Sequence, residues 1–157
     1  MVGDSLRQIA PDLSERLRGE TESRLRTVAL AVCKFAVNSA GLESPVVGDV
    51  LERLEAGKGI RATLRGKLEK LAEDLDERYF EWYNSVEEGR AESEGLDAAF
   101  EKARAAAAVL AACKEDAFVA VTECIYEGWA AIDQNMHAIR RIVTETLSTA
   151  KSQVTEP

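Results

Sequence analysis

Apolar residues recur at intervals of three and four along almost the whole chain, which is the spacing of one face of an α-helix. The longest unbroken series consists of Ile60, Leu64, Leu68, Leu71, Leu75, Tyr79, Trp82 and Val86. It repeats after eleven residues, or about 3.67 residues per turn, which favours a nearly straight helix. At about 1.5 Å of rise per residue, residues 60–88 are therefore predicted to form a rod about 40 Å long.

Residues that start and stop helices divide the rest of the chain. Pro11 and the pair Ser44-Pro45 are typical of a first helical turn, whereas Gly41 and Gly57 are typical of helix ends. The alanine-rich segment after residue 95 predicts a thin helix that neighbours can approach closely, so we expect it at the centre. The predicted main helices lie near 11–40, 60–88, 96–113 and 117–148, with a short crossover helix at 45–56.

Three details of this pattern leave alternatives open. The polar residues 19–23 weaken the first apolar stripe and permit a bend there, and residues 4–10 are compatible with one more short helical turn. The register from Phe118 to Leu147 fits one helix, or two helices if Asp133 caps a separate last one. Residues 118–126 have strand propensity, but their spacing of three and four favours helix.

The length of 157 residues suits one domain, and no internal repeat or linker divides the chain. We therefore expect an all-α fold, a helical bundle of four main helices plus a short crossover helix. The expected domain covers residues 1–151, followed by a disordered tail at 152–157.

The composition excludes several classes of protein. Hydrophobic residues make up 46% and charged residues 31% of the chain, a balance typical of globular proteins. No apolar run approaches the roughly 18–20 residues that a membrane span needs. Residues 1–7 contain no apolar signal core, so we expect a cytoplasmic protein that does not associate with membranes.

The three cysteines, Cys33, Cys113 and Cys124, form an odd set without close spacing. Structural zinc sites usually draw on cysteines two to four residues apart, so a zinc site made of these cysteines and His137 is disfavoured. All three lie in apolar surroundings along the chain. We expect free, buried thiols that pack as small hydrophobic side chains.

Motifs for catalysis are missing from the sequence. His137 is the single histidine, and no glutamate precedes it by three residues, which excludes a di-iron bundle. Phosphate-binding glycine loops and nucleophile-elbow motifs do not occur. Arg140 and Arg141 could hold an anion, but they lie toward a helix C-terminus, where positive charge complements the macrodipole. We expect no catalytic residue and no cofactor.

One carboxylate pattern supports a second hypothesis. Glu52-x-x-Glu55, then seventeen residues, then Glu73-x-x-Asp76 resembles the loose motif of the all-helical nucleotide pyrophosphohydrolases of the MazG type. The resemblance implies carboxylates that hold magnesium for a small metal-dependent hydrolase. At about 100° per residue, Glu52 and Glu73 point about 150–160° away from their apolar stripes, toward solvent rather than into a shared cleft.

The net charge of −8 is concentrated in one stretch. Residues 69–94 contain ten acidic and three basic side chains, a net charge of −7. The average field of the chain repels nucleic acid, so we expect no nucleic-acid partner. Four aromatic residues share the acidic stretch: Tyr79, Phe80, Trp82 and Tyr83.

Phe80 carries the leading hypothesis for function. It lies about 140° from the centre of the core stripe, and Tyr83 lies about 80° from it. An apolar ring among carboxylates is typical of a recognition surface, unless residues 90–95 or the N-terminal segment of the chain cover the ring. We therefore expect a non-enzymatic interaction module: an adaptor, an inhibitor or immunity-type protein, or a homo-oligomer subunit. Its partner is a basic protein or a second copy, and its expected interaction residues are Glu69, Asp76, Phe80, Tyr83 and Glu87.

Overall fold

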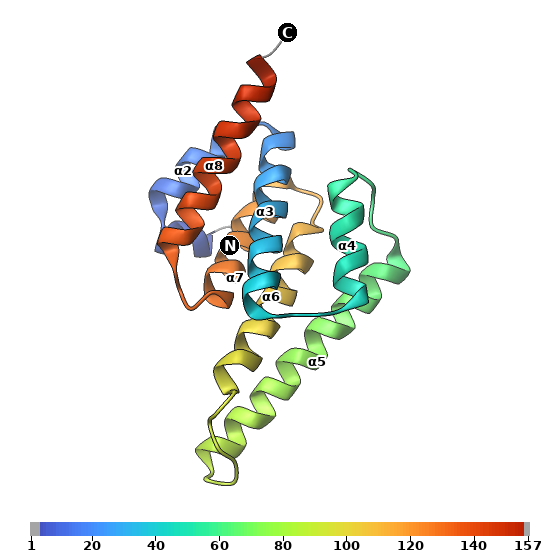
Figure 1. The fold of residues 1–157 in the computed structure, drawn as a ribbon, viewed down its shortest axis with the longest axis vertical. Coiled ribbons are helices and arrows are strands. Elements are labelled where there is room, and N and C mark those ends of the chain that lie inside the picture. Colours follow the sequence, from blue (N-terminus) through green and yellow to red (C-terminus); the bar gives the residue numbers. More distant parts are fainter. Residues whose placement is uncertain (1–3, 156–157) are drawn as a thin grey trace.

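The computed structural model describes residues 4–155, and within them it is all-helical, without strands. Eight helices follow one another in this part of the chain (Figure 1). Their bounds are α1 (Asp4–Ile9), α2 (Pro11–Arg18), α3 (Glu22–Ala40), α4 (Pro45–Glu55), α5 (Ala62–Glu87), α6 (Leu96–Ala112), α7 (Ala117–Ala131) and α8 (Met136–Thr155).

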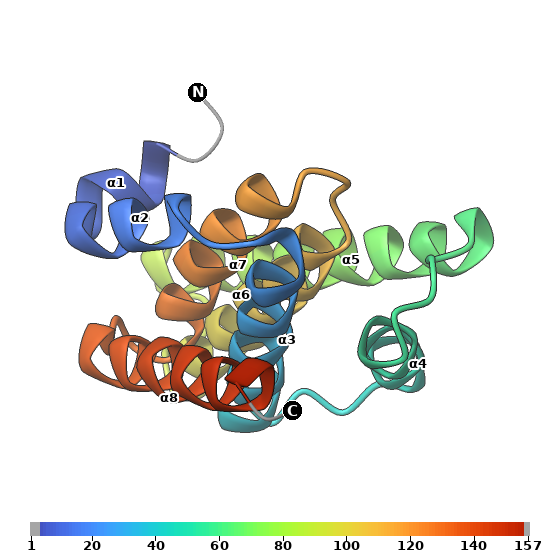
Figure 2. The same ribbon diagram turned by 90° about the horizontal axis from the view of Figure 1, so that it is seen from above.

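Helices α3, α6 and α7 form the centre of the molecule (Figure 2). Val32, Val109 and Ile125, one from each of these helices, are fully buried. Alanines occupy most of the buried positions of α6, so its neighbours can approach its backbone closely. The prediction that the alanine-rich helix is central is therefore confirmed.

The contact between α3 and α7 depends on a glycine. A Cβ atom on Gly128 of α7 would lie 2.8 Å from Cγ1 of Val32 on α3. Carbon atoms pack at about 3.5–4.0 Å, so any larger residue here would overlap Val32. This close approach fixes the two helices against each other.

The predicted helix near 11–40 consists of two helices, α2 and α3. The break lies at residues 19–21, within the polar stretch that permits a bend. Thr21 caps α3, because its hydroxyl accepts a hydrogen bond from the backbone N–H of Arg24 at 3.3 Å. The short helical turn near residues 4–10 is present as α1.

The predicted helix near 117–148 also consists of two helices. Asp133 and Gln134 adopt φ angles of 56° and 58°, which end α7 and turn the chain into α8. Asp133 does not cap the last helix. That position belongs to Asn135, whose side chain accepts a hydrogen bond from the backbone N–H of Ala138 at 3.1 Å.

A short helix, α4, is present at the predicted position and packs against α3, α5 and α6. The last helix, α8, continues to Thr155, so it includes four residues of the expected tail. Residues 156–157 of that tail lie outside the described residues. Between α1 and α8, the structure shows no helix with the length and apolarity that a membrane crossing needs.

The second half of α5 and the first half of α6 project from the body as a helical hairpin (Figure 1). Leu68 and Ala72 are the buried residues of α5, and the first buried residue of α6 is Ala103. Residues 73–102, which we call the arm, contain no buried side chain. The arm therefore presents most of its surface to the surroundings of the protein.

Candidate functional site

The arm carries the whole net charge of the protein. Residues 73–102 contain eleven acidic and three basic side chains, a net charge of −8. The rest of the chain contains seventeen of each sign and is neutral. The negative potential of the protein is therefore concentrated on the arm.

Two exposed aromatic rings lie within this acidic surface. Phe80 is 57% exposed and Tyr83 is 41% exposed, and they are the large hydrophobic side chains that the described residues leave exposed. Both rest against Tyr79, with ring centroids 5.3 Å and 6.0 Å away. Tyr79 in turn packs on Phe100 of α6 at 5.2 Å. The exposed rings are thus held in place before any partner arrives.

The turn at the tip of the arm covers Trp82 rather than Phe80. The indole Nε1 of Trp82 donates a hydrogen bond of 2.9 Å to the carbonyl of Glu92. The ring also lies against Gly95, where a Cβ atom would come within 3.0 Å of it. Gly95 has a φ angle of 87°, which an L side chain rarely adopts. Both the backbone angle and the contact with Trp82 therefore require glycine at this position. Phe80 is left open.

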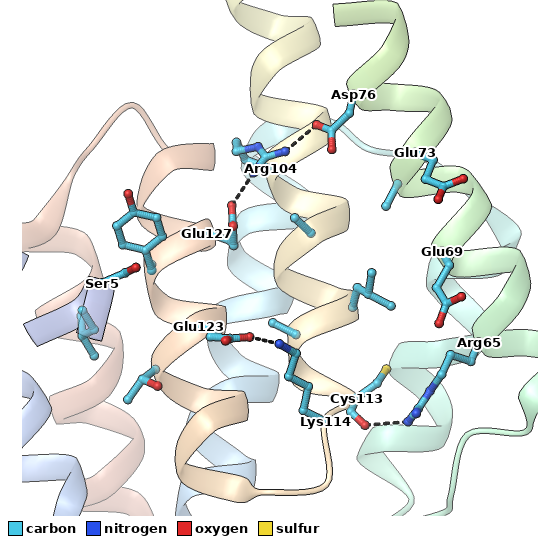
Figure 3. A pocket seen from close by; sticks show the side chains of 17 residues that line it. Ser5, Arg65, Glu69, Glu73, Asp76, Arg104, Cys113, Lys114, Glu123 and Glu127 are labelled. Atoms are coloured by element: carbon cyan, nitrogen blue, oxygen red, sulfur yellow. Dashed lines mark hydrogen bonds and ion pairs between the residues drawn. The ribbon is translucent and has the colours of Figure 1, made fainter. Parts of the chain in front are cut away.

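A groove of about 720 Å³ lies beside the arm, between α5 and α7 (Figure 3). Its floor is α6, which contributes Ala107, Leu110 and Ala111. One wall is α5, with Glu69, Glu73 and Asp76, and the other is α7, with Glu123 and Glu127 among its residues. We call this hollow the α5–α7 groove.

Arg104 joins the two walls at the end of the groove nearest the arm. Its guanidinium binds Glu127 of α7 at 2.8 Å and also binds Asp76 of α5. Burial raises the pKa of Glu127, and Arg104 offsets part of that effect. Burial alone would lower the pKa of Arg104, but Glu127 and Asp76 raise it overall. The bridge holds both walls to the floor.

The far end of the groove is closed by two more basic residues. Lys114 pairs with Glu123 on the α7 wall. Arg65, on the α5 wall, donates a hydrogen bond of 2.7 Å to the carbonyl oxygen of Cys113. Within the described residues, no ion pair engages Glu69 or Glu73, and both side chains are exposed.

The structure places the predicted interaction residues along one face of α5. Glu69 and Asp76 line the groove, and Phe80 and Tyr83 are exposed on the arm. Glu87 is exposed at the end of the helix. Asp76 differs from the rest because Arg104 already neutralises it. When Glu73 is added, the predicted residues are spaced alternately by four and three positions, which is the spacing of one helix face. The series is Glu69, Glu73, Asp76, Phe80, Tyr83 and Glu87.

The carboxylates of the hydrolase motif do not meet in one cavity. Glu52 lines a different hollow, between α4 and the start of α5. Glu55 pairs with Lys34 at 3.0 Å, and Asp76 is held by Arg104. In the part of the chain that the structure describes, no three acidic, histidine or cysteine side chains are arranged to hold a metal ion. The resemblance in spacing is therefore not matched by geometry.

Most of the other residues considered from the sequence have structural partners. Cys33 and Cys124 are fully buried, with their Sγ atoms 3.2 Å apart, and His137 is exposed on α8. Cys113 is buried at the far end of the groove. Arg140 makes a two-pronged ion pair with Asp12 that joins α8 to α2. Its guanidinium serves a contact between helices.

Sequence reasoning missed the α7 wall and the Arg104 bridge. Glu123 and Glu127 come about fifty residues after the α5 stripe in the chain. Their spacing of four residues showed that they share a helix face, but not which helix that face looks toward. The sequence did contain one signal. Both glutamates lie off the apolar stripe of their helix, as Glu69 lies off the apolar stripe of α5.

Comparison with known proteins adds no family to this picture. No protein-family model matches the chain, and neither the curated proteins nor the solved structures hold a match to it. What the chain does must therefore be inferred from its own residues.

Proposed function

We propose that this chain is a non-enzymatic protein-interaction module that captures a basic protein on the arm. The observation that carries the proposal is the exposure of Phe80 and Tyr83 in a surface that holds the entire net charge of the protein. Exposed aromatic rings are the side chains that most often dominate the energy of an interface.

The two kinds of residue on the arm have different tasks in this proposal. Phe80 and Tyr83 supply apolar area, and Tyr79 holds them in place, so little side-chain entropy is lost on binding. The carboxylates steer a basic partner toward the arm and set its orientation. Nucleic acid, with its negative backbone, does not fit such a surface.

The proposal includes a cytoplasmic location. Cys33, Cys113 and Cys124 are free thiols in the structure, and thiols of this kind persist where the surroundings keep cysteines reduced. A second copy of the chain remains an alternative partner. It is less favoured because two arms of the same charge repel each other.

Affinity capture with a matched variant tests the proposal. The immobilised chain and its Phe80→Ala/Tyr83→Ala variant are exposed to the same cell extract, and the retained proteins are compared by mass spectrometry. We expect at least one basic protein that the native surface retains and the variant loses. Circular dichroism of both forms shows that the variant is folded.

The control variant changes exposed residues away from the arm. Replacing Glu43 and Glu145, which are exposed on the body, by glutamine should leave capture unchanged. If the aromatic variant retains the same proteins as the native chain, the arm is not the interaction surface. Size-exclusion chromatography with light scattering tests self-association. If the native chain is a dimer and the Phe80→Ala/Tyr83→Ala variant is a monomer, the partner is a second copy of the chain.

A further inference from the structure

The α5–α7 groove has the shape of an unfilled helix position. Helices α5 and α7 both pack against α6, on either side of it (Figure 3). The floor between them consists of Ala107, Ala111 and Leu110. Alanine side chains let a further helix approach within the usual interaxial distance of about 8–10 Å. An added helix would pack against three existing ones.

The charges of the groove select the kind of helix. Arg104 and Lys114 already neutralise acidic residues of the walls, whereas Glu69 and Glu73 have no ion pair within the described residues. A helix in the groove would therefore meet apolar floor on one side and two available carboxylates on the α5 side. The helix that complements this groove is amphipathic, and its apolar face is flanked by lysine or arginine.

The length of the site follows from the α5 stripe. Arg104 of α6 and Lys114, which follows the end of α6, are ten residues apart, so the floor between them is about 15 Å long. The same side of α5 continues beyond Asp76 to Phe80 and Tyr83. From Glu69 to Tyr83 is fourteen residues, or about 21 Å, which matches about four turns of a bound helix.

We infer that the α5–α7 groove binds one basic amphipathic helix, about four turns long, whose far end lies on Phe80 and Tyr83. This inference rests on the proposed function and names the segment of the partner that the surface takes. Helices in grooves are a recurring mode of recognition, in which apolar anchors at helical spacing enter the groove.

Two synthetic peptides of the same composition test the inference by isothermal titration calorimetry. Each has about 15 residues of lysine, leucine and alanine, with blocked ends. In the first, the order of residues makes an amphipathic helix, and in the second the same residues are permuted to remove the apolar face. The amphipathic peptide should bind at least about tenfold more tightly, since charge alone is equal in both.

Filling the floor of the groove shows where the peptide sits. Ala107→Phe places a ring in the groove and should weaken binding of the amphipathic peptide by about tenfold or more. The matched control is Ala56→Phe, because Ala56 is exposed at the end of α4, outside both the arm and the groove. It should change the dissociation constant by less than about twofold. Thermal melting followed by circular dichroism shows that both variants are folded.

Charge reversal tests the α5 wall. Glu69→Lys/Glu73→Lys should weaken binding by about tenfold or more. Glu43→Lys/Glu145→Lys makes the same change in net charge on the body and should have a smaller effect. Equal effects of the two double variants would show that only the overall charge matters and would overturn the assigned position.

Three further outcomes overturn the inference. They are no binding of the amphipathic peptide, equal binding of the permuted one, and full binding by Ala107→Phe. The proposed function fails separately. If Phe80→Ala/Tyr83→Ala loses the captured protein while Ala107→Phe keeps it, the arm remains the interaction surface and the groove is not its helix site.

Discussion

At the scale of single residues, replacing Phe80 distinguishes a role in binding from a role in folding. Its ring is 57% exposed and packs edge-on against Tyr79. Phe80→Ala should therefore lower the free energy of unfolding by less than about 1 kcal/mol. Leu68→Ala, on the buried side of the same helix, should lower it by about 2–5 kcal/mol. Urea denaturation measures both, and a loss of about 3 kcal/mol in Phe80→Ala would mean that the ring belongs to the core.

The thiols give a second test at this scale. The hydrogen bond with Cys124 and burial raise the pKa of Cys33, and burial raises the pKa of Cys113. Because the thiolate is the reactive form, Cys33 and Cys113 should label slowly with a maleimide in the native protein, and the full burial of Cys124 should slow its labelling too. Cys113, which is 8% exposed and lines the groove, should label before the two fully buried cysteines. Mass spectrometry of peptides after timed labelling measures the order in which the three cysteines react. Early labelling of Cys33 or Cys124 would contradict this account of the core.

Glu127 makes the stability of the protein depend on pH. Burial raises the pKa of its carboxyl above the ordinary value of 4.5, although Arg104 offsets part of the effect. The native state therefore takes up this proton at a higher pH than the unfolded state does. The resulting stabilisation is complete below about pH 4.5 and is lost as the pH rises through the native pKa.

The Glu127→Gln variant isolates this contribution because glutamine does not titrate. As the pH falls from 7 toward 4.5, the difference in the free energy of unfolding between the native chain and the variant should shift in favour of the native chain. Urea denaturation at several pH values in this range measures the difference. A difference that stays constant, or shifts toward the variant, would show that burial does not raise this pKa.

At the scale of helices, the contact of α3 with α7 depends on one glycine. Gly128→Ala gains helix propensity of about 1 kcal/mol, but overpacking against the fully buried Val32 costs about 1–3 kcal/mol. We expect a net loss of stability in the native background and a gain in a Val32→Ala background, where the space is open. A double-mutant cycle measured by urea denaturation gives the coupling, and additive effects would contradict the close approach.

Local rules predicted most of the helices and left two of the breaks open as alternatives. The periodicity of the long segment placed it at 60–88, and α5 covers Ala62–Glu87. The break inside 117–148 depends on the left-handed Asp133 and Gln134, and the break inside 11–40 lies at the polar residues 19–21. An apolar stripe continues in register across such a turn, so periodicity alone cannot place the turn.

The candidate site was predictable on one helix only. The exposed ring and the flanking carboxylates of α5 follow from angles along a single helix, and the structure leaves Phe80 open. The groove needs α7, and the contact of Cys33 with Cys124 joins residues 91 positions apart. Packing between distant helices decides both, and no local pattern encodes it.

At the scale of the whole molecule, a neutral body carries an acidic arm. The separation predicts a strong dependence on salt for association with a basic partner, because steering by surface charge is screened within about 10 Å at 0.1 M ionic strength. Dissociation depends mainly on the buried aromatic contact and responds less to salt. In the proposed complex, the carboxylates of the arm would govern the association rate and its two rings the dissociation rate.

The equilibrium dissociation constant of the captured partner, measured for the native chain and for Phe80→Ala at one salt concentration, tests the central claim most directly. The interface account predicts that the variant binds more weakly by about 2 kcal/mol or more, a factor of about 30. Equal dissociation constants for the two proteins, both folded, would contradict the claim that the exposed rings of the arm hold the partner.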